Sequence, residues 1–252
     1  MIKKHAIIKS ERMCVSVVKE TSCGAVVYRW KNMKREFLMI KHLQGRHIGF
    51  PKGHVEKDEK PWQTAKREIY EETGVLSYIY KNNYVKTNYQ PSEHVDKDVF
   101  YYVGKPINTN LKAQETEVTD VFWLVEDEVL KTLTYQGDKE VFNQLLQVIN
   151  DMEKDIPDAL IDYVEGDILP QYDDFDDGHH RDHIYAVIEA SLVLAKQYDV
   201  RKDIVFIIAC YHDLGLQFGR ETHHITSGEL LLNDLFIRSY FTNEECQLMK
   251  DA

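Results

Sequence analysis

Residues 53–75 read GHVEKDEKPWQTAKREIYEETGV, and this stretch predicts a polar loop followed by one short helix. Pro61 suits the first helical position, where its missing N–H is not needed, and Gly74 suits the C-terminal stop. Ala65 and Ile69 are four residues apart and therefore lie on the same apolar face. The pattern predicts a helix that begins at Pro61 and stops before Gly74.

Three glutamates follow one side of this helix. At about 100° per residue, Glu68, Glu71 and Glu72 fall within an arc of about 100°, beside the apolar face. They lie near the negative end of the helix dipole and repel one another, so a cation would stabilise them. Oxygen ligands favour Mg²⁺ or Mn²⁺ over zinc, and such an ion on a diphosphate would position an attacking water. An isolated pair of glutamates would more simply be the solvated face of an amphipathic helix.

The spacing around these glutamates is more specific than the glutamates alone. It resembles the Nudix box at every defined position, namely Gly53, Glu59, Arg67, Glu68, Ile69, Glu71, Glu72, Gly74 and Val75. The resemblance extends over about residues 13–150 and implies hydrolysis of a nucleoside diphosphate linked to another group. It implies that the three helix glutamates and the Gly53 carbonyl bind the metal, whereas Glu59 and Arg67 brace the loop and the helix.

The flanking residues resemble the diadenosine tetraphosphate hydrolase branch of that family. The resemblance rests on GFPKGHVE at residues 49–56 and on SCGA at residues 22–25. It implies that Lys52 contacts phosphate as a point charge. It also implies that Tyr101 stacks on the base, with the neighbouring Tyr102 as an alternative. A position in the core is the competing interpretation of Tyr101.

A fourth glutamate is expected at the same site. The branch has a glutamate in the loop before a tryptophan-bearing strand, and Glu117 precedes Trp123 by six residues. The resemblance implies that Glu117 is the general base or another metal ligand, and Glu115 is the alternative.

The first half of the chain has the pattern of a β-rich domain. Residues 22–30 and 36–41 predict a hairpin, and residues 98–103 and 121–125 predict further strands. A second helix is predicted at residues 138–152, with an apolar stripe of Val141, Leu145, Val148 and Ile149. Together with the first helix, these elements predict an α/β sandwich, the Nudix fold, over residues 1–152.

The second half predicts helix after helix, and therefore an all-α domain over residues 153–252. The boundary falls near residues 150–158, which are polar and lead into Pro157. The predicted helical segments are residues 161–169, 184–195, 204–211 and 225–236.

This half also carries histidines and one His-Asp pair, at His183, at His212-Asp213 and at His223-His224. Imidazole and carboxylate groups from packed helices can bind one cation and activate its water. The pattern resembles the HD superfamily of metal-dependent phosphohydrolases over about residues 158–252. It implies that His183, His212 and Asp213 bind a divalent metal, and that His223 or His224 lies near a phosphate or a second metal.

One ligand of that family is missing from the pattern. The family completes its metal site with a later aspartate, and neither Asp234 nor Asp251 has the family's sequence context. We therefore expect either a chain that continues beyond Ala252 or a helical domain that has lost its metal site.

Charge and cysteine content narrow the class of protein. The net charge is −11, divided into +3 for residues 1–150 and −14 for residues 151–252. The negative charge of the second half argues against its binding to a nucleic-acid backbone. The longest apolar run, at about residues 204–210, is too short to span a membrane, and the N-terminus is not a secretory signal. Four scattered cysteines predict reduced thiols in a cytoplasmic protein. The sequence makes no prediction of oligomeric state.

The leading hypothesis is a Mg²⁺-dependent enzyme that cleaves dinucleoside polyphosphates, such as diadenosine tetraphosphate, or nucleotides with a similar tail. A metal-activated water would attack a phosphorus, and Glu117 or one of the helix glutamates Glu68, Glu71 and Glu72 would take its proton. One alternative is a nucleotide sensor that binds without cleavage and is coupled to the helical domain. Another is an enzyme that acts on 5′-triphosphorylated RNA ends, which the weak charge of the first half disfavours.

Overall fold

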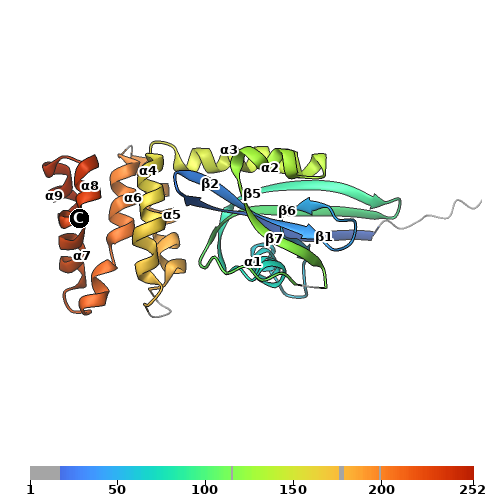
Figure 1. The fold of residues 1–252 in the computed structure, drawn as a ribbon, viewed down its shortest axis with the longest axis horizontal. Coiled ribbons are helices and arrows are strands. Elements are labelled where there is room, and N and C mark those ends of the chain that lie inside the picture. Colours follow the sequence, from blue (N-terminus) through green and yellow to red (C-terminus); the bar gives the residue numbers. More distant parts are fainter. Residues whose placement is uncertain (1–17, 115, 176–178, 199) are drawn as a thin grey trace, which may run out of the picture.

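The structure, a computed structural model, describes residues 18–114, 116–175, 179–198 and 200–252. Figure 1 shows a β-rich part and a helical part that lie side by side along the long axis of the molecule. No helix in the described ranges is both long and apolar enough to cross a membrane.

A mixed sheet forms the centre of the β-rich part. Its strands are β1 (Val18–Lys31), β2 (Lys34–His42), β3 (Ile48–Gly49), β4 (Lys52–His54), β5 (Ser77–Ser92), β6 (Val95–Pro106) and β7 (Val118–Val125). The path runs β3-β2-β1-β6-β5, while β4 pairs with β1 and β7 pairs with β2. The central β1 and β6 are parallel, from Val18 opposite Val95 to Val27 opposite Gly104. The other paired strands are antiparallel.

Helices cover both faces of this sheet, as Figure 1 shows. Side chains alternate along β1, so Ala25 and Val27 belong to the cluster with α1 (Pro61–Thr73), while Val26 and Tyr28 belong to the larger cluster with α3 (Gln136–Glu153). The short α2 (Glu126–Thr132) follows β7 directly. The predicted α/β sandwich is confirmed for this part of the chain.

The helical part is also confirmed. It comprises α4 (Asp158–Tyr163), a π-helical turn (Val164–Ile168), a 3₁₀ turn (Leu169–Tyr172), α5 (Arg181–Tyr198), α6 (Lys202–Tyr211), a 3₁₀ turn (Leu214–Phe218), α7 (His223–Asn233), α8 (Leu235–Tyr240) and α9 (Asn243–Asp251). The expected helix at residues 225–236 is wrong in one respect, because it breaks at Asp234. The Asp234 carboxylate accepts the backbone N–H groups of Phe236 and Ile237 and thereby begins α8.

The two parts share one hydrophobic core. A single buried cluster runs from Val26 in β1 through Leu145 in α3 to Ile207 in α6 and Met249 in α9. The predicted boundary at residues 152–153 falls in the last turn of α3, which ends at Glu153. The division into two domains therefore stays a prediction. Cys23, Cys210 and Cys246 are buried free thiols, in line with the expected reduced state, and Cys14 lies outside the described residues.

Candidate active site

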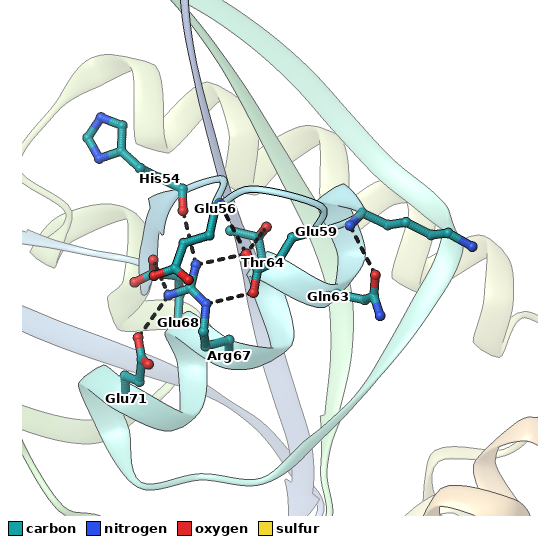
Figure 2. A network of polar contacts seen from close by, with 9 residues as sticks. His54, Glu56, Glu59, Gln63, Thr64, Arg67, Glu68 and Glu71 are labelled. Carbon is teal, nitrogen blue, oxygen red and sulfur yellow. Dashed lines mark hydrogen bonds and ion pairs between the residues drawn. The ribbon is translucent and has the colours of Figure 1, made fainter.

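The loop before α1 is tied to the helix by Arg67, as Figure 2 shows. Arg67 Nε donates to Glu59 Oε1 at 2.8 Å, and Nη2 donates to Glu59 Oε2 and to the His54 carbonyl, both at 3.0 Å. Its hydrogen bond with Arg67 holds the pKa of the Glu59 carboxyl at about 2. Thr64 adds a hydroxyl donor to Glu59 at 2.7 Å. This geometry fits the expectation that Glu59 and Arg67 brace the loop and the helix.

The same guanidinium gathers two of the helix glutamates. Arg67 Nη1 donates to Glu68 Oε1 and to Glu71 Oε2, both at 2.8 Å. Burial raises the pKa of Glu68, while Arg67 opposes this shift. Gly53 lies directly against Glu68, since a Cβ built on Gly53 would come within 2.1–2.2 Å of the three carboxyl atoms. The structure therefore places Gly53 against Glu68 and joins Glu68 to Glu71 through Arg67, and the metal-binding role of these residues stays a prediction.

Glu72 lies deeper, with 2% of its surface exposed. Its Oε2 accepts the backbone N–H of Lys52 at 2.8 Å, which connects α1 to β4. Burial raises the pKa of Glu72 to about 8, with further contributions from the charges of Glu68 and Glu117. A negative charge here is therefore poorly compensated by the protein alone.

Glu117 lies in the loop that precedes β7. Its carbonyl accepts the Leu43 N–H at 2.8 Å, and its N–H donates to the Gln114 carbonyl at 3.0 Å, so the backbone is held in place. Its side chain is exposed, and its charge raises the pKa of both Glu68 and Glu72. Glu117 thus lies near the helix glutamates, as expected for this position. The alternative, Glu115, lies outside the described residues.

Tyr101 is a core residue in this structure. Its ring is 2% exposed and packs edge-on against Phe50 at 6.3 Å, and its hydroxyl donates to Asp138 Oδ1 at 3.3 Å. Tyr102, the alternative, is 5% exposed and lies in the other cluster, beneath α1. The alternation of β6 sends both rings into the two cores, so neither presents a free face to a base. The structure supports the core interpretation of Tyr101 and not the stacking role.

Three other rings form an aromatic ledge, defined here as His42, His47 and Tyr135; the Tyr135 ring is exposed and the two imidazoles are partly buried. The His42 and His47 rings stack with centroids 4.0 Å apart, and Tyr135 lies 5.1 Å from His47. Burial lowers the pKa of His42 to about 4, with smaller contributions from His47 and Lys52, so this ring is neutral at pH 7. The ledge joins β2, the loop before β3 and the turn before α3. Its three rings come from separate segments, so no local pattern in the sequence indicates it.

The helical part contains a second cluster, formed by His183, His212 and Asp213. Asp213 Oδ2 lies 3.4 Å from His183 Nε2 and 3.1 Å from His212 Nε2, and the two imidazole nitrogens are 3.3 Å apart. His212 Nδ1 donates to the Ala209 carbonyl at 2.8 Å, which leaves Nε2 as the free ligand atom. Across the described ranges, these three side chains are the group whose ligand atoms already lie within 4.8 Å of one another. The sequence predicted this set.

Four other residues are candidates for a fourth group at this second cluster, and their contacts distinguish between them. His223 Nε2 lies 3.7 Å from Asp213 Oδ1, whereas His224 is exposed and packs edge-on against His223. Asp234 accepts the hydroxyls of Tyr163 and Tyr211, each at 2.6 Å, and Asp251 accepts from Gln247. Both aspartates have structural partners elsewhere, so the geometry favours His223 as the fourth group.

Comparison with known proteins gives the family of the β-rich part. The model of the NUDIX domain matches residues 21–145. The chain is 29% identical over 153 residues to the MutT4 protein of Mycobacterium tuberculosis, a match that covers 57% of this chain and 61% of that protein. It is 28% identical over 134 residues to the asymmetrical bis(5′-nucleosyl)-tetraphosphatase of Sus scrofa, covering 49% of this chain and 90% of that one. The chain therefore spans about three fifths of the length of the first of these relatives.

Solved structures resemble the same part of the chain. An Ap4A hydrolase of C. elegans, solved as a binary complex, is 24% identical, with a TM-score of 0.48 and coverage of 52% of this chain and 98% of that one.

Proposed function

Because residues 21–145 form a Nudix domain, we propose that this chain hydrolyses a nucleoside diphosphate linked to another group, using a divalent cation held by the α1 glutamates. One observation carries the proposal: Glu68 lies against the Gly53 backbone, Glu72 accepts the Lys52 amide at the start of β4, and Arg67 joins Glu71 to Glu68. Two of the three carboxylates of the predicted helix thus lie against β4, and Arg67 ties the third to one of them.

The chemistry of these side chains fits a hard cation. Nudix hydrolases generally use divalent metals such as Mg²⁺, and carboxylate and carbonyl oxygens are the ligands that Mg²⁺ prefers. In the structure, the Arg67 guanidinium supplies positive charge to Glu68 and Glu71, while Glu72 remains buried with its pKa raised to about 8 by burial. A bound cation would polarise the phosphoryl group and lower the pKa of a bound water.

The protein's own groups would position the substrate. Lys52 carries a positive charge beside Glu72 and would bind a phosphate as a point charge. Glu117, exposed and close to Glu68 and Glu72, would accept a proton from the attacking water or bind the cation. Glu59 and Arg67 would hold the loop, so that Gly53 stays against Glu68.

The finer proposal is a dinucleoside polyphosphate as substrate. The Sus scrofa relative is named for the tetraphosphate of this class, and the aromatic ledge offers the exposed Tyr135 ring beside two partly buried imidazoles, on which a base could stack. A sensor that binds without cleavage, and an enzyme for 5′-triphosphorylated RNA ends, are the alternatives that the experiment distinguishes.

The test is incubation of the purified chain with diadenosine tetraphosphate and Mg²⁺. We expect ATP and AMP as products, and a decrease in kcat/KM of about 100-fold or more in Glu71→Gln and Glu72→Gln. The exposed Glu128→Gln in α2 is the control and keeps its activity. Binding of the substrate without formation of products would support a nucleotide sensor. Hydrolysis of 5′-triphosphorylated RNA but not of diadenosine tetraphosphate would support an enzyme that acts on RNA ends. Equal activity of all variants would contradict the metal site.

A second candidate function belongs to the helical part. We propose that His183, His212 and Asp213 bind a divalent cation, with His223 as the fourth group, as in an HD-type phosphohydrolase. Two imidazoles and a carboxylate within 4.8 Å of one another suit Mn²⁺, Zn²⁺ or Fe²⁺. His212→Gln should lower the bound metal by one ion per chain, measured by elemental analysis, whereas His224→Gln, which changes an exposed neighbour, should not. Equal metal content in the wild type and in His212→Gln would contradict this site.

A further inference from the structure

Asp138 occupies an unusual place in the first turn of α3. Its side chain is partly buried on the face of the sheet opposite to α1, and its Oδ1 accepts the Tyr101 hydroxyl at 3.3 Å. Its Oδ2 lies against Gly49, where a built Cβ would be 3.2 Å away, so the absence of a side chain at Gly49 leaves room for the carboxylate. The strand and the helix thus place a carboxylate beside β3 and β4.

This carboxylate has few partners for its charge. Among the described residues, no lysine, arginine or histidine nitrogen forms an ion pair with it within 4.0 Å. A carboxylate offers about four lone-pair sites to donors, and one hydrogen bond of 3.3 Å uses little of this capacity. Burial raises the pKa of Asp138, and the nearby charge of Lys52 opposes that shift.

Aromatic rings lie near the Asp138 carboxylate, and two of them are exposed. The charge of Asp138 acts on the pKa of His47 in the aromatic ledge, and Tyr135, which is 53% exposed, packs against that imidazole. Tyr89 in β5 is 44% exposed; burial raises its pKa, and the charge of Asp138 adds to that shift. The carboxylate therefore lies among rings on which a base could stack.

Lys52 connects this region to the carboxylates of α1. Its charge acts on the pKa of Asp138 and also on that of Glu72, so Lys52 lies near both carboxylates. A nucleotide with its phosphates at Lys52 and the cation would extend its nucleoside toward Asp138. A carboxylate repels phosphate, whereas it accepts hydrogen bonds from the N–H groups of a base.

We infer that Asp138 determines specificity by accepting hydrogen bonds from a nucleobase edge that carries N–H donors, while the base stacks on the aromatic ledge. This inference rests on the proposed function for the phosphate end of the substrate. Adenine and guanine both present such donors, and an unsubstituted purine base presents none. A site built around an acceptor rejects an analogue that lacks the donor, because the acceptor is then left without a partner.

The test compares dinucleoside tetraphosphates that contain adenine, guanine or unsubstituted purine. For the wild type, we expect the donor-free purine substrate to show a KM about 10- to 100-fold higher than the better of the other two, with little change in kcat. In Asp138→Ala this ratio should fall to about 1. Comparison of the adenine-containing and guanine-containing substrates identifies which base edge Asp138 recognises.

Two further variants separate recognition from folding. Glu140→Ala alters an exposed glutamate of the same helix and should leave the KM ratio unchanged. Asp138→Asn keeps an acceptor for the Tyr101 hydroxyl, so a folding defect caused only by loss of that contact should not occur in it. We expect Asp138→Asn to retain the wild-type melting temperature but to lose at least part of the discrimination.

Failure of the inference about Asp138 can be distinguished from failure of the proposed function. If the wild type hydrolyses none of these substrates, the proposed function fails, and calorimetric titration with AMP, GMP and purine riboside monophosphate still tests Asp138. Equal KM values, or equal affinities, for donor-bearing and donor-free bases in the wild type would overturn the inference. A loss of discrimination that follows removal of a ribose hydroxyl instead of the base donors would overturn it as well.

Discussion

Glu72 shows how one side chain can combine burial with a charge that the protein does not compensate. The carboxyl is 2% exposed, and burial raises its pKa from 4.5 to about 8. Between these pH values the folded chain binds a proton that the unfolded chain has released. The free energy of unfolding of the metal-free protein therefore falls as the pH rises from about 4.5 through about 8.

Glu72→Gln tests this directly, because glutamine resembles the protonated carboxyl at every pH. We expect the metal-free variant to melt several degrees above the metal-free wild type at pH 8, and at nearly the same temperature at pH 4.5. Mg²⁺ should raise the melting temperature of the wild type at pH 8 and leave that of the variant nearly unchanged. Thermal denaturation with EDTA and with Mg²⁺ measures both effects, and parallel pH profiles of the two proteins would contradict the role assigned to burial.

At the scale of the element, the junction between β4 and α1 depends on close approach of a strand backbone to a helix side chain. Gly53 touches the Glu68 carboxylate, and Arg67 fixes the loop through Glu59. Any side chain at Gly53 would displace Glu68 from its place beside the strand.

Gly53→Ala should therefore reduce kcat/KM by at least about 10-fold, because the new methyl group displaces a proposed metal ligand. Gly137→Ala in the first turn of α3 is the matched control, since a Cβ there meets nothing within 4 Å. We expect this control to keep its activity and to gain up to about 1 kcal/mol of stability. Steady-state kinetics and urea denaturation of both variants give the comparison, and a fully active Gly53→Ala would show that Glu68 can move without consequence.

The elements differ in how well the sequence predicts them. The bounds of α1 follow from Pro61 and Gly74, because both residues act locally, and Gly74 does adopt the left-handed conformation of a C-cap, with φ of 74°. Strand β5 was not predicted, because SYIYKNNYVKTNYQPS is polar and largely exposed and is held mainly by its partner β6. The aromatic ledge was not predicted either, because its three rings come from separate segments that only the fold brings together.

At the scale of the whole molecule, a buried ion pair joins the sheet to the helices. Lys105 in β6 is 4% exposed and pairs with Glu165 of the π-helical turn, whose Oε2 also accepts the Trp30 N–H at 2.6 Å. Glu153 accepts the Tyr28 hydroxyl at 2.8 Å beside it. In the sequence, Lys105 and Glu165 look like surface residues, and the change of net charge suggested two units. Their partnership depends on tertiary packing, which no local pattern reports.

Lys105→Met removes one partner and leaves a buried carboxylate without its cation. We expect a loss of about 3–5 kcal/mol in the free energy of unfolding. Lys131→Met, which breaks the exposed pair with Glu128, should cost less than about 1 kcal/mol. Chemical denaturation of both variants measures the contrast. Equal small losses would show that the interface between the two parts contributes little to stability.

The parallel pairing of β1 with β6 bears on how this chain folds as it is synthesised. Val18 in β1 lies opposite Val95 in β6, and β2 pairs with β7, which also comes much later in the chain. Strands that are far apart in the sequence pair slowly, because closing the large loop between them costs conformational entropy before their hydrogen bonds form. A nascent chain that has emerged only as far as the α1 glutamates therefore has no central strand pair, and its β1–β2 hairpin exposes an edge to other molecules. That edge of β1 gains its partner strand only when β6 has been synthesised.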